Sequence, residues 1–144
     1  HRNMGLERDV EKGTISTNPE NHELMVRARQ AKIAQIADSI PALQLINAQQ
    51  NKDVLLVGWG STEGHLHAAA NELGCALAQF NYICPLPRNT REVLSQYKRI
   101  IVCELNTGQF ATYLRAQFPE ITFEQYNEIQ GQPFAIERIV NFVN

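Results

Sequence analysis

A short run of glycine and hydroxyl residues follows one apolar segment of the chain: Gly58, Trp59, Gly60, Ser61 and Thr62. Backbone N–H groups at a helix start can hold an anion, and two hydroxyls add donors. The glycines fall as G-x-G-x-x-x-G up to Gly64, not as the G-x-G-x-x-G of dinucleotide-binding turns. A dinucleotide site is therefore disfavoured. Two interpretations stay open: a phosphate or other anion site, or a tight turn with Ser61 or Thr62 as helix cap.

A second polar loop follows another apolar segment and holds Glu104, Leu105, Asn106, Thr107, Gly108 and Gln109. In open α/β sheets, ligands bind at the carboxyl ends of strands where the strand order reverses. If the two apolar strands are neighbours, both loops border one crevice. Its candidate residues are Gly58, Trp59, Gly60, Ser61, Thr62, Glu104, Asn106, Thr107 and Gly108. In the alternative interpretation, Glu104 accepts hydrogen bonds from loop amides and fixes the turn.

Residue types that carry catalysis or bind metals are sparse. His65 and His67 are two positions apart, so on a helix they do not face each other. The cysteines, Cys75, Cys84 and Cys103, are odd in number and not spaced as C-x-x-C, which disfavours disulfides and a zinc site. Three cysteines cannot supply the four thiolates of an iron–sulfur cluster. We expect buried, reduced thiols in a cytoplasmic protein, no catalytic residue and no metal site.

Two further loops combine glycine, proline and polar residues. Residues 84–87 (CPLP) form a stiff loop that follows a predicted strand. The other loop is formed by Gln130, Gly131, Gln132, Pro133 and Phe134. It is typical of a structural connector, and the alternative is an interface with a neighbouring domain.

The elements that position these loops alternate between strand and helix. Asn18-Pro19-Glu20 begins a helix that Pro41 stops. Later strands are predicted at 43–46, 53–58, 76–83, 99–105 and 121–126, and helices at 61–73, 89–96, 108–117 and 133–143. This alternation predicts an α/β fold with a largely parallel sheet covered on both faces.

Composition fits a single globular domain: 144 residues, 44% hydrophobic and 19% charged. A net charge of -2 gives no basis for binding nucleic acid. The apolar runs at 54–57 and 100–103 are far shorter than the ~20 residues of a membrane-spanning helix. Residues 1–17 are polar and start without Met, so we expect a linker or tail and a chain cut from a longer polypeptide.

Six stretches, in this order, resemble the C-terminal part of the alpha subunit of 2-oxoacid:ferredoxin oxidoreductases, most closely the 2-oxoglutarate branch. They are 5–7 (GLE), 18–22 (NPENH), 57–62 (VGWGST), 85–87 (PLP), 104–109 (ELNTGQ) and 130–134 (QGQPF). The stretches at 58–62 and 130–134 favour this family over transketolases and branched-chain dehydrogenases.

The resemblance implies a transketolase C-terminal-like domain over 18–144, with 1–17 as the tail of a preceding thiamine-binding domain or a linker. It implies a three-layer α/β/α sandwich and a five-stranded mixed sheet of order 1-3-2-4-5, with strand 1 antiparallel. The parent enzymes oxidatively decarboxylate a 2-oxoacid to an acyl-CoA and reduce ferredoxin.

Thiamine diphosphate, magnesium, iron–sulfur clusters and coenzyme A would then bind outside this chain, which would be inactive alone. Its expected partners are the remaining domains and subunits, with ferredoxin reached through the complex. The alternative is a free-standing module that binds an anion or nucleotide at the helix start formed by Gly60 to Thr62.

Overall fold

The computed structural model describes residues 7–48 and 51–144. The chain divides into two compact units, His1–Ile40 and Pro41–Asn144. Residues 1–6 lie outside the described residues, and they include the start of the predicted tail and most of the stretch at 5–7. The assignment of 1–17 to a preceding domain stays a prediction.

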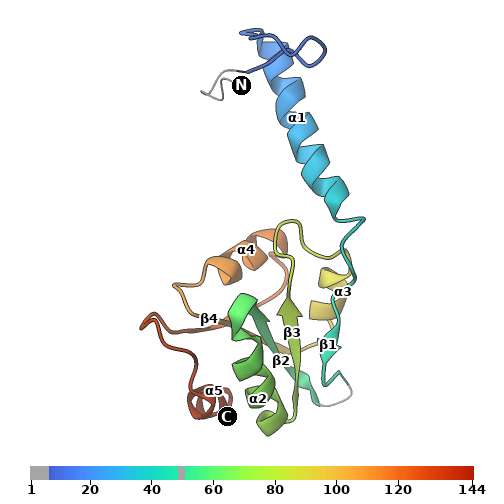
Figure 1. The fold of residues 1–144 in the computed structure, drawn as a ribbon. Coiled ribbons are helices and arrows are strands. Elements are labelled where there is room, and N and C mark those ends of the chain that lie inside the picture. The colour runs from blue at the N-terminus through green and yellow to red at the C-terminus, as the bar shows by residue number, and fades with distance from the viewer. Residues whose placement is uncertain (1–6, 49–50) are drawn as a thin grey trace. The chain divides into compact units, whose positions relative to one another are not determined.

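The first unit contains one long helix, α1 (Pro19–Ile36), which begins as the sequence predicts (Figure 1). The Asn18 side chain accepts a hydrogen bond from the Asn21 amide at 2.9 Å, and Pro19 occupies the first turn. The helix ends before Pro41 because 37–39 form tighter turns, such as Ala37 N–H to the Ala34 carbonyl.

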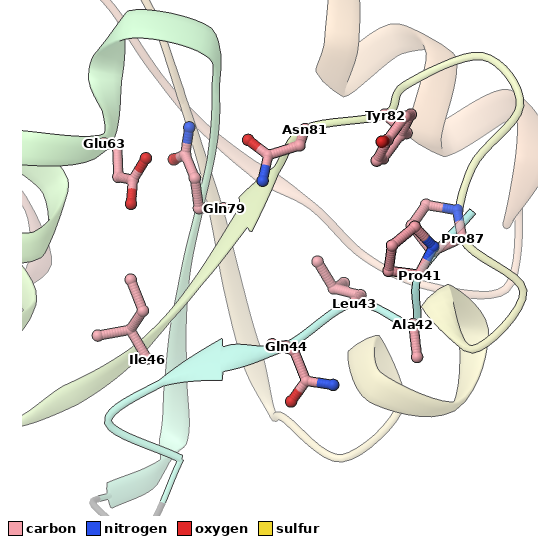
Figure 2. A pocket seen from close by; sticks show the side chains of 10 residues that line it. All are labelled: Pro41, Ala42, Leu43, Gln44, Ile46, Glu63, Gln79, Asn81, Tyr82 and Pro87. Carbon is pink, nitrogen blue, oxygen red and sulfur yellow. The ribbon is translucent and has the colours of Figure 1, made fainter.

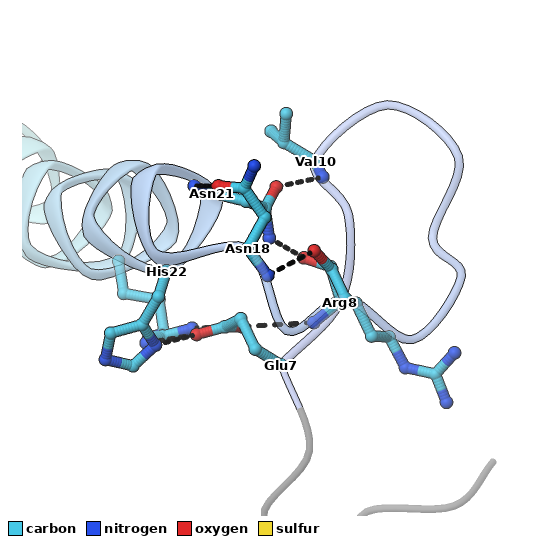
Figure 3. Close-up of polar contacts among 8 residues, drawn as sticks. Glu7, Arg8, Val10, Asn18, Asn21 and His22 are labelled. Carbon is cyan, nitrogen blue, oxygen red and sulfur yellow. Dashed lines mark hydrogen bonds and ion pairs between the residues drawn. The ribbon is translucent and has the colours of Figure 1, made fainter.

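Residues 7–16 fold into a small turn against the start of α1 (Figure 3). The Glu7 carboxylate accepts from Arg29 at 3.2 and 3.3 Å and lies 2.9 Å from His22 Nδ1. Asn21 Nδ2 donates to the Arg8 carbonyl at 2.7 Å, and Asn21 Oδ1 accepts from the Val10 amide. Polar contacts, rather than an apolar core, therefore order this predicted tail.

The second unit is built on a five-stranded sheet of order β1-β3-β2-β4-β5. β3 pairs with β1 in antiparallel orientation, and all the other neighbours are parallel. This confirms the sheet that the resemblance implies. The strands are β1 (Leu45–Ile46), β2 (Asn51–Trp59), β3 (Cys75–Phe80), β4 (Arg99–Glu104) and β5 (Glu124–Asn127).

Helices cover both faces of this sheet, which makes three layers (Figure 1). One buried cluster joins it to α2 and α5, and the other joins it to α3 and α4. Leu55 and Leu56 point into opposite clusters, as alternation along a strand requires. The helices are α2 (Glu63–Leu73), α3 (Thr90–Leu94), α4 (Gln109–Gln117) and α5 (Ile136–Val143), and a 3-10 turn (Gly60–Thr62) precedes α2.

Two of the later elements begin three residues after their predicted starts. β5 begins at Glu124 rather than 121, because the Ile121 amide bonds back to the Phe118 carbonyl at 3.0 Å. α5 begins at Ile136 rather than 133, because Ala135 keeps an extended conformation as its N-cap. No helix in the described part of the chain is long and apolar enough to cross a membrane.

Candidate functional site

The two polar loops lie side by side because β2 and β4 are neighbours in the sheet. Val57 of β2 is in register with Val102 of β4, so both strands end at the same edge. A cavity of about 170 Å³ lies between the loops, lined by Trp59, Gly60, Ser61, Thr62, Leu105 and Asn106. The structure thus brings the predicted crevice together, while the ligand remains a prediction. The other four predicted residues lie outside this lining: Thr107 is exposed, and Gly58, Glu104 and Gly108 are buried.

Glu104 is the buried centre of this edge, with 1% of its surface exposed. Its Oε1 accepts from the Phe110 amide at 2.9 Å, and its Oε2 accepts from the Ala111 amide at 3.0 Å. Oε1 also accepts from Asn106 Nδ2 at 3.1 Å and Trp59 Nε1 at 3.3 Å. The carboxylate therefore caps the positive end of α4 and holds both loops, as the turn-fixing interpretation predicts.

Asn106 accepts hydrogen bonds from the remaining backbone N–H groups at the start of α4. Its Oδ1 accepts from the Gly108 amide at 2.7 Å and from the Gln109 amide at 3.2 Å. With Glu104, this takes up the N–H groups of 108–111. An anion at this helix start would have to displace these side chains, so α4 does not favour one.

An internal hydrogen bond and close packing also hold the turn that leads into α2. Thr62 Oγ1 donates to the Trp59 carbonyl at 2.9 Å, so its hydroxyl does not cap an α2 amide. Gly60 has a φ of 62°, which glycine adopts without strain. Gly58 is tightly enclosed, since an added Cβ would lie 2.2 Å from Leu66 Cδ1. Ser61 is exposed and keeps its hydroxyl on the surface.

Trp59 separates the crevice from a second cavity of about 280 Å³. The indole packs edge-on against Phe110, with ring centroids 6.4 Å apart. The other lining residues of the second cavity are Ile83, Cys84, Gln109 and Tyr113. Sequence reasoning missed this aromatic groove because its residues come from three separate segments. The cis Cys84–Pro85 peptide lies beside it.

The loop before α5 divides into an exposed and a buried part. Gln130, Gly131, Gln132 and Pro133 are exposed. Phe134 is only 3% exposed, and its ring lies 5.7 Å from that of Tyr126. The interface predicted for this loop stays a prediction, and only the four exposed residues are accessible to a neighbour.

The cysteines differ in their surroundings. Cys75 and Cys103 are buried, as predicted, but Cys84 is exposed because its loop runs over the surface. Burial raises the pKa of the Cys75 thiol to about 11 and also raises that of Cys103. Across 7–48 and 51–144, no group of three or more His, Cys, Asp or Glu residues could hold a metal ion.

Comparison with known proteins finds similarity to 2-oxoglutarate oxidoreductases. The chain is 37% identical over 99% of its length to the KorA subunit of 2-oxoglutarate oxidoreductase from Mycobacterium tuberculosis. It is 31% identical, with a TM-score of 0.85 over 99% of its length, to a structure of 2-oxoglutarate:ferredoxin oxidoreductase from Magnetococcus marinus with 2-oxoglutarate, coenzyme A and succinyl-CoA bound. The chain spans 22% of the first protein and 26% of the second. No protein-family profile matches it.

Proposed function

We propose that this chain is the C-terminal structural and assembly domain of a 2-oxoacid:ferredoxin oxidoreductase alpha subunit. The observation that carries the proposal is similarity over 99% of the chain to two such proteins, in sequence and in fold. Because the chain spans about a quarter of their length, the activity belongs to the larger protein.

The reaction proposed for the parent complex is oxidative decarboxylation of 2-oxoglutarate to an acyl-CoA, with reduction of ferredoxin. Both similar proteins carry 2-oxoglutarate in their names, which supports this substrate over other 2-oxoacids. Thiamine diphosphate, magnesium, iron–sulfur clusters and coenzyme A are proposed to bind outside this chain. Three free cysteines support a cytoplasmic location.

A structural role fits the chemistry of the crevice. Glu104 is the buried acidic residue at the end of β4 beside the crevice, and its oxygens accept from four donors. A carboxylate held in this way is a poor general base, because a proton would replace existing hydrogen bonds. The residues that meet at the strand ends are therefore proposed to shape a surface, not to act on a substrate.

Exposed apolar surface supports contacts with the rest of the complex. In the first unit, α1 leaves Leu24, Ile33 and Ile36 between 43% and 49% exposed. In the second unit, the aromatic groove beside Trp59 and the exposed 130–133 loop are the proposed contact sites. Exposed apolar side chains and apolar grooves occur on surfaces that a neighbouring domain covers.

Deletion of residues 18–144 from the parent polypeptide tests this role. We expect the purified enzyme to lose its subunit composition and its turnover with 2-oxoglutarate, coenzyme A and ferredoxin. Retention of both after deletion would refute the assembly role. Turnover of pyruvate in preference to 2-oxoglutarate would refute only the proposal that 2-oxoglutarate is the substrate.

The second candidate function is a small module that binds an anion or nucleotide at the Gly60–Thr62 turn. The cavity between the two loops favours it, whereas the occupied amides of α4 do not. A thermal shift with phosphate, nucleotides, nicotinamide cofactors and coenzyme A tests it. We expect unchanged midpoints, and clear stabilisation by one of these compounds would favour the binding module.

A further inference from the structure

β5 is an edge strand of the sheet, and β4 is the strand with which it pairs. The Glu128 amide donates to the Glu104 carbonyl at 3.0 Å, so Glu128 faces β4. Alternate residues of a parallel ladder face the same neighbour, so Gln125 and Asn127 face away from β4. Their backbone N–H and C=O groups have no hydrogen-bond partner among the described residues. They form an open row of donors and acceptors with which another strand can pair.

This edge does not carry the features that usually keep an edge strand from pairing. Natural edges are blunted by Lys or Pro, by a bulge, or by a very short strand. β5 has the sequence EQYN, and all of it pairs with β4 in unbroken register. The opposite edge is β1, which has only two residues and follows Leu43 and Gln44 (Figure 2). There the Asn89 side chain binds the N–H and the C=O of Leu43, at 2.8 and 3.1 Å, so the chain satisfies this backbone itself.

Exposed apolar side chains flank the open edge. Ile129, two residues after β5, is 70% exposed, the largest exposed fraction among the described large hydrophobic side chains. Phe142 of α5 is 41% exposed, and its ring lies 5.2 Å from that of Tyr126 in β5. An extended polypeptide offers both backbone groups for the edge and side chains for these apolar residues. The combination therefore favours a polypeptide partner over a small polar ligand.

Charge disfavours a second copy of this chain as that partner. A two-fold pairing of two β5 strands centred on Tyr126 would match Gln125 with Asn127 of the other copy and use all the open groups. The same register would place Glu124 directly opposite Glu128 of the other copy, on both sides of the two-fold axis. Like charges directly opposite each other destabilise a sheet.

We propose that the outer edge of β5 pairs with an extended segment of the parent assembly that lies outside this chain. Its backbone would bond to Gln125 and Asn127, and its apolar side chains would pack on Phe142 and Ile129. The chain spans 22% and 26% of two similar proteins, so their remaining length can supply such a segment. This inference rests on the proposed role in a larger assembly and adds the backbone groups that make the contact.

Amide hydrogen exchange of the native assembly, resolved to single residues by mass spectrometry with electron-transfer fragmentation, tests the pairing. A strand bonded on one side alone exchanges slowly at Tyr126 and Glu128 but fast at Gln125 and Asn127. We expect slow exchange at all four positions.

A matched pair of variants tests the apolar contact in the same assay. Ile129→Lys places a charge in the contact, so protection should be lost at Gln125 and Asn127 but kept at Tyr126. The control is Tyr82→Lys, which alters an exposed aromatic residue just after β3 (Figure 2) and should leave all protection unchanged. Equal protection in both variants would show that Ile129 makes no contact with the added strand and would count against the proposal.

A photocross-linker, p-benzoylphenylalanine in place of Ile129, identifies the partner in the native assembly. A cross-link to a segment outside this chain supports the proposal, and a cross-link to 124–129 of a second copy overturns it. Fast exchange at Gln125 and Asn127 in an assembly larger than 16.3 kDa would also overturn it, but would leave the proposed function intact. Isolation of a 16.3 kDa protein without partners would instead refute the proposed function, and with it this partner.

Discussion

Replacement of Glu104 by glutamine tests whether this carboxylate holds the two loops together. The variant keeps the side-chain shape and one oxygen, which can still accept from Trp59, Asn106 and Phe110. Its new NH2 group faces the Ala111 amide, so two donors meet where Oε2 now accepts at 3.0 Å. The unpaired buried amide costs about 1–3 kcal/mol. Loss of charge at the helix start adds about 0.3–1 kcal/mol. The expected loss in unfolding free energy is therefore about 1.3–4 kcal/mol.

Urea unfolding, followed by fluorescence, measures this loss directly. Trp59 is the single tryptophan of the chain and donates to Glu104, so its emission reports on this site. The matched control is Glu72→Gln, an exposed glutamate at the far end of α2 from its first turn, for which we expect a change within about 0.5 kcal/mol. Equal small losses for both variants would show that Glu104 does not stabilise this edge of the sheet.

Three further predictions follow from packing and ionisation. Gly58→Ala should lower the urea midpoint because its Cβ would lie 2.2 Å from Leu66 Cδ1, whereas Gly64→Ala, with open space around it, should not. Iodoacetamide at neutral pH should label exposed Cys84 well before Cys75, whose pKa is raised to about 11, as peptide mass spectrometry would reveal. Hydrogen bonding from Arg29 lowers the pKa of Glu7 below its ordinary value of 4.5, so its contribution to stability is present above that pH. It is lost as the pH falls through the lowered pKa. The protection factors of the amides in 8–16, which correct for the intrinsic pH dependence of exchange, should then fall. Protection factors that acid leaves unchanged would argue against this network.

The strands and helices were predictable because each has a strong local signal. The apolar runs around Leu55 and Ile101 have the pattern of buried parallel strands, and Asn18-Pro19 has that of a helix start. Strand order was not predictable from these signals, since it depends on contacts between distant segments. The resemblance to a known family supplied the order that the sheet confirms.

Side-chain partners at the crevice were only partly predictable. That Glu104 would bind loop amides followed from its place between a strand end and a helix start. The bond from Trp59 and the burial of Phe134 depend on packing between segments, which local sequence does not encode. Exposure of Cys84 depends on the path of a proline-rich loop, so counting cysteines could not reveal it.

The most direct measurement is the activity of the endogenous protein that contains this sequence, isolated in its native assembly. We predict that the isolated complex reduces ferredoxin when supplied with both 2-oxoglutarate and coenzyme A, and fails when either is left out. Isolation of a 16.3 kDa protein without partners and without this activity would contradict the account.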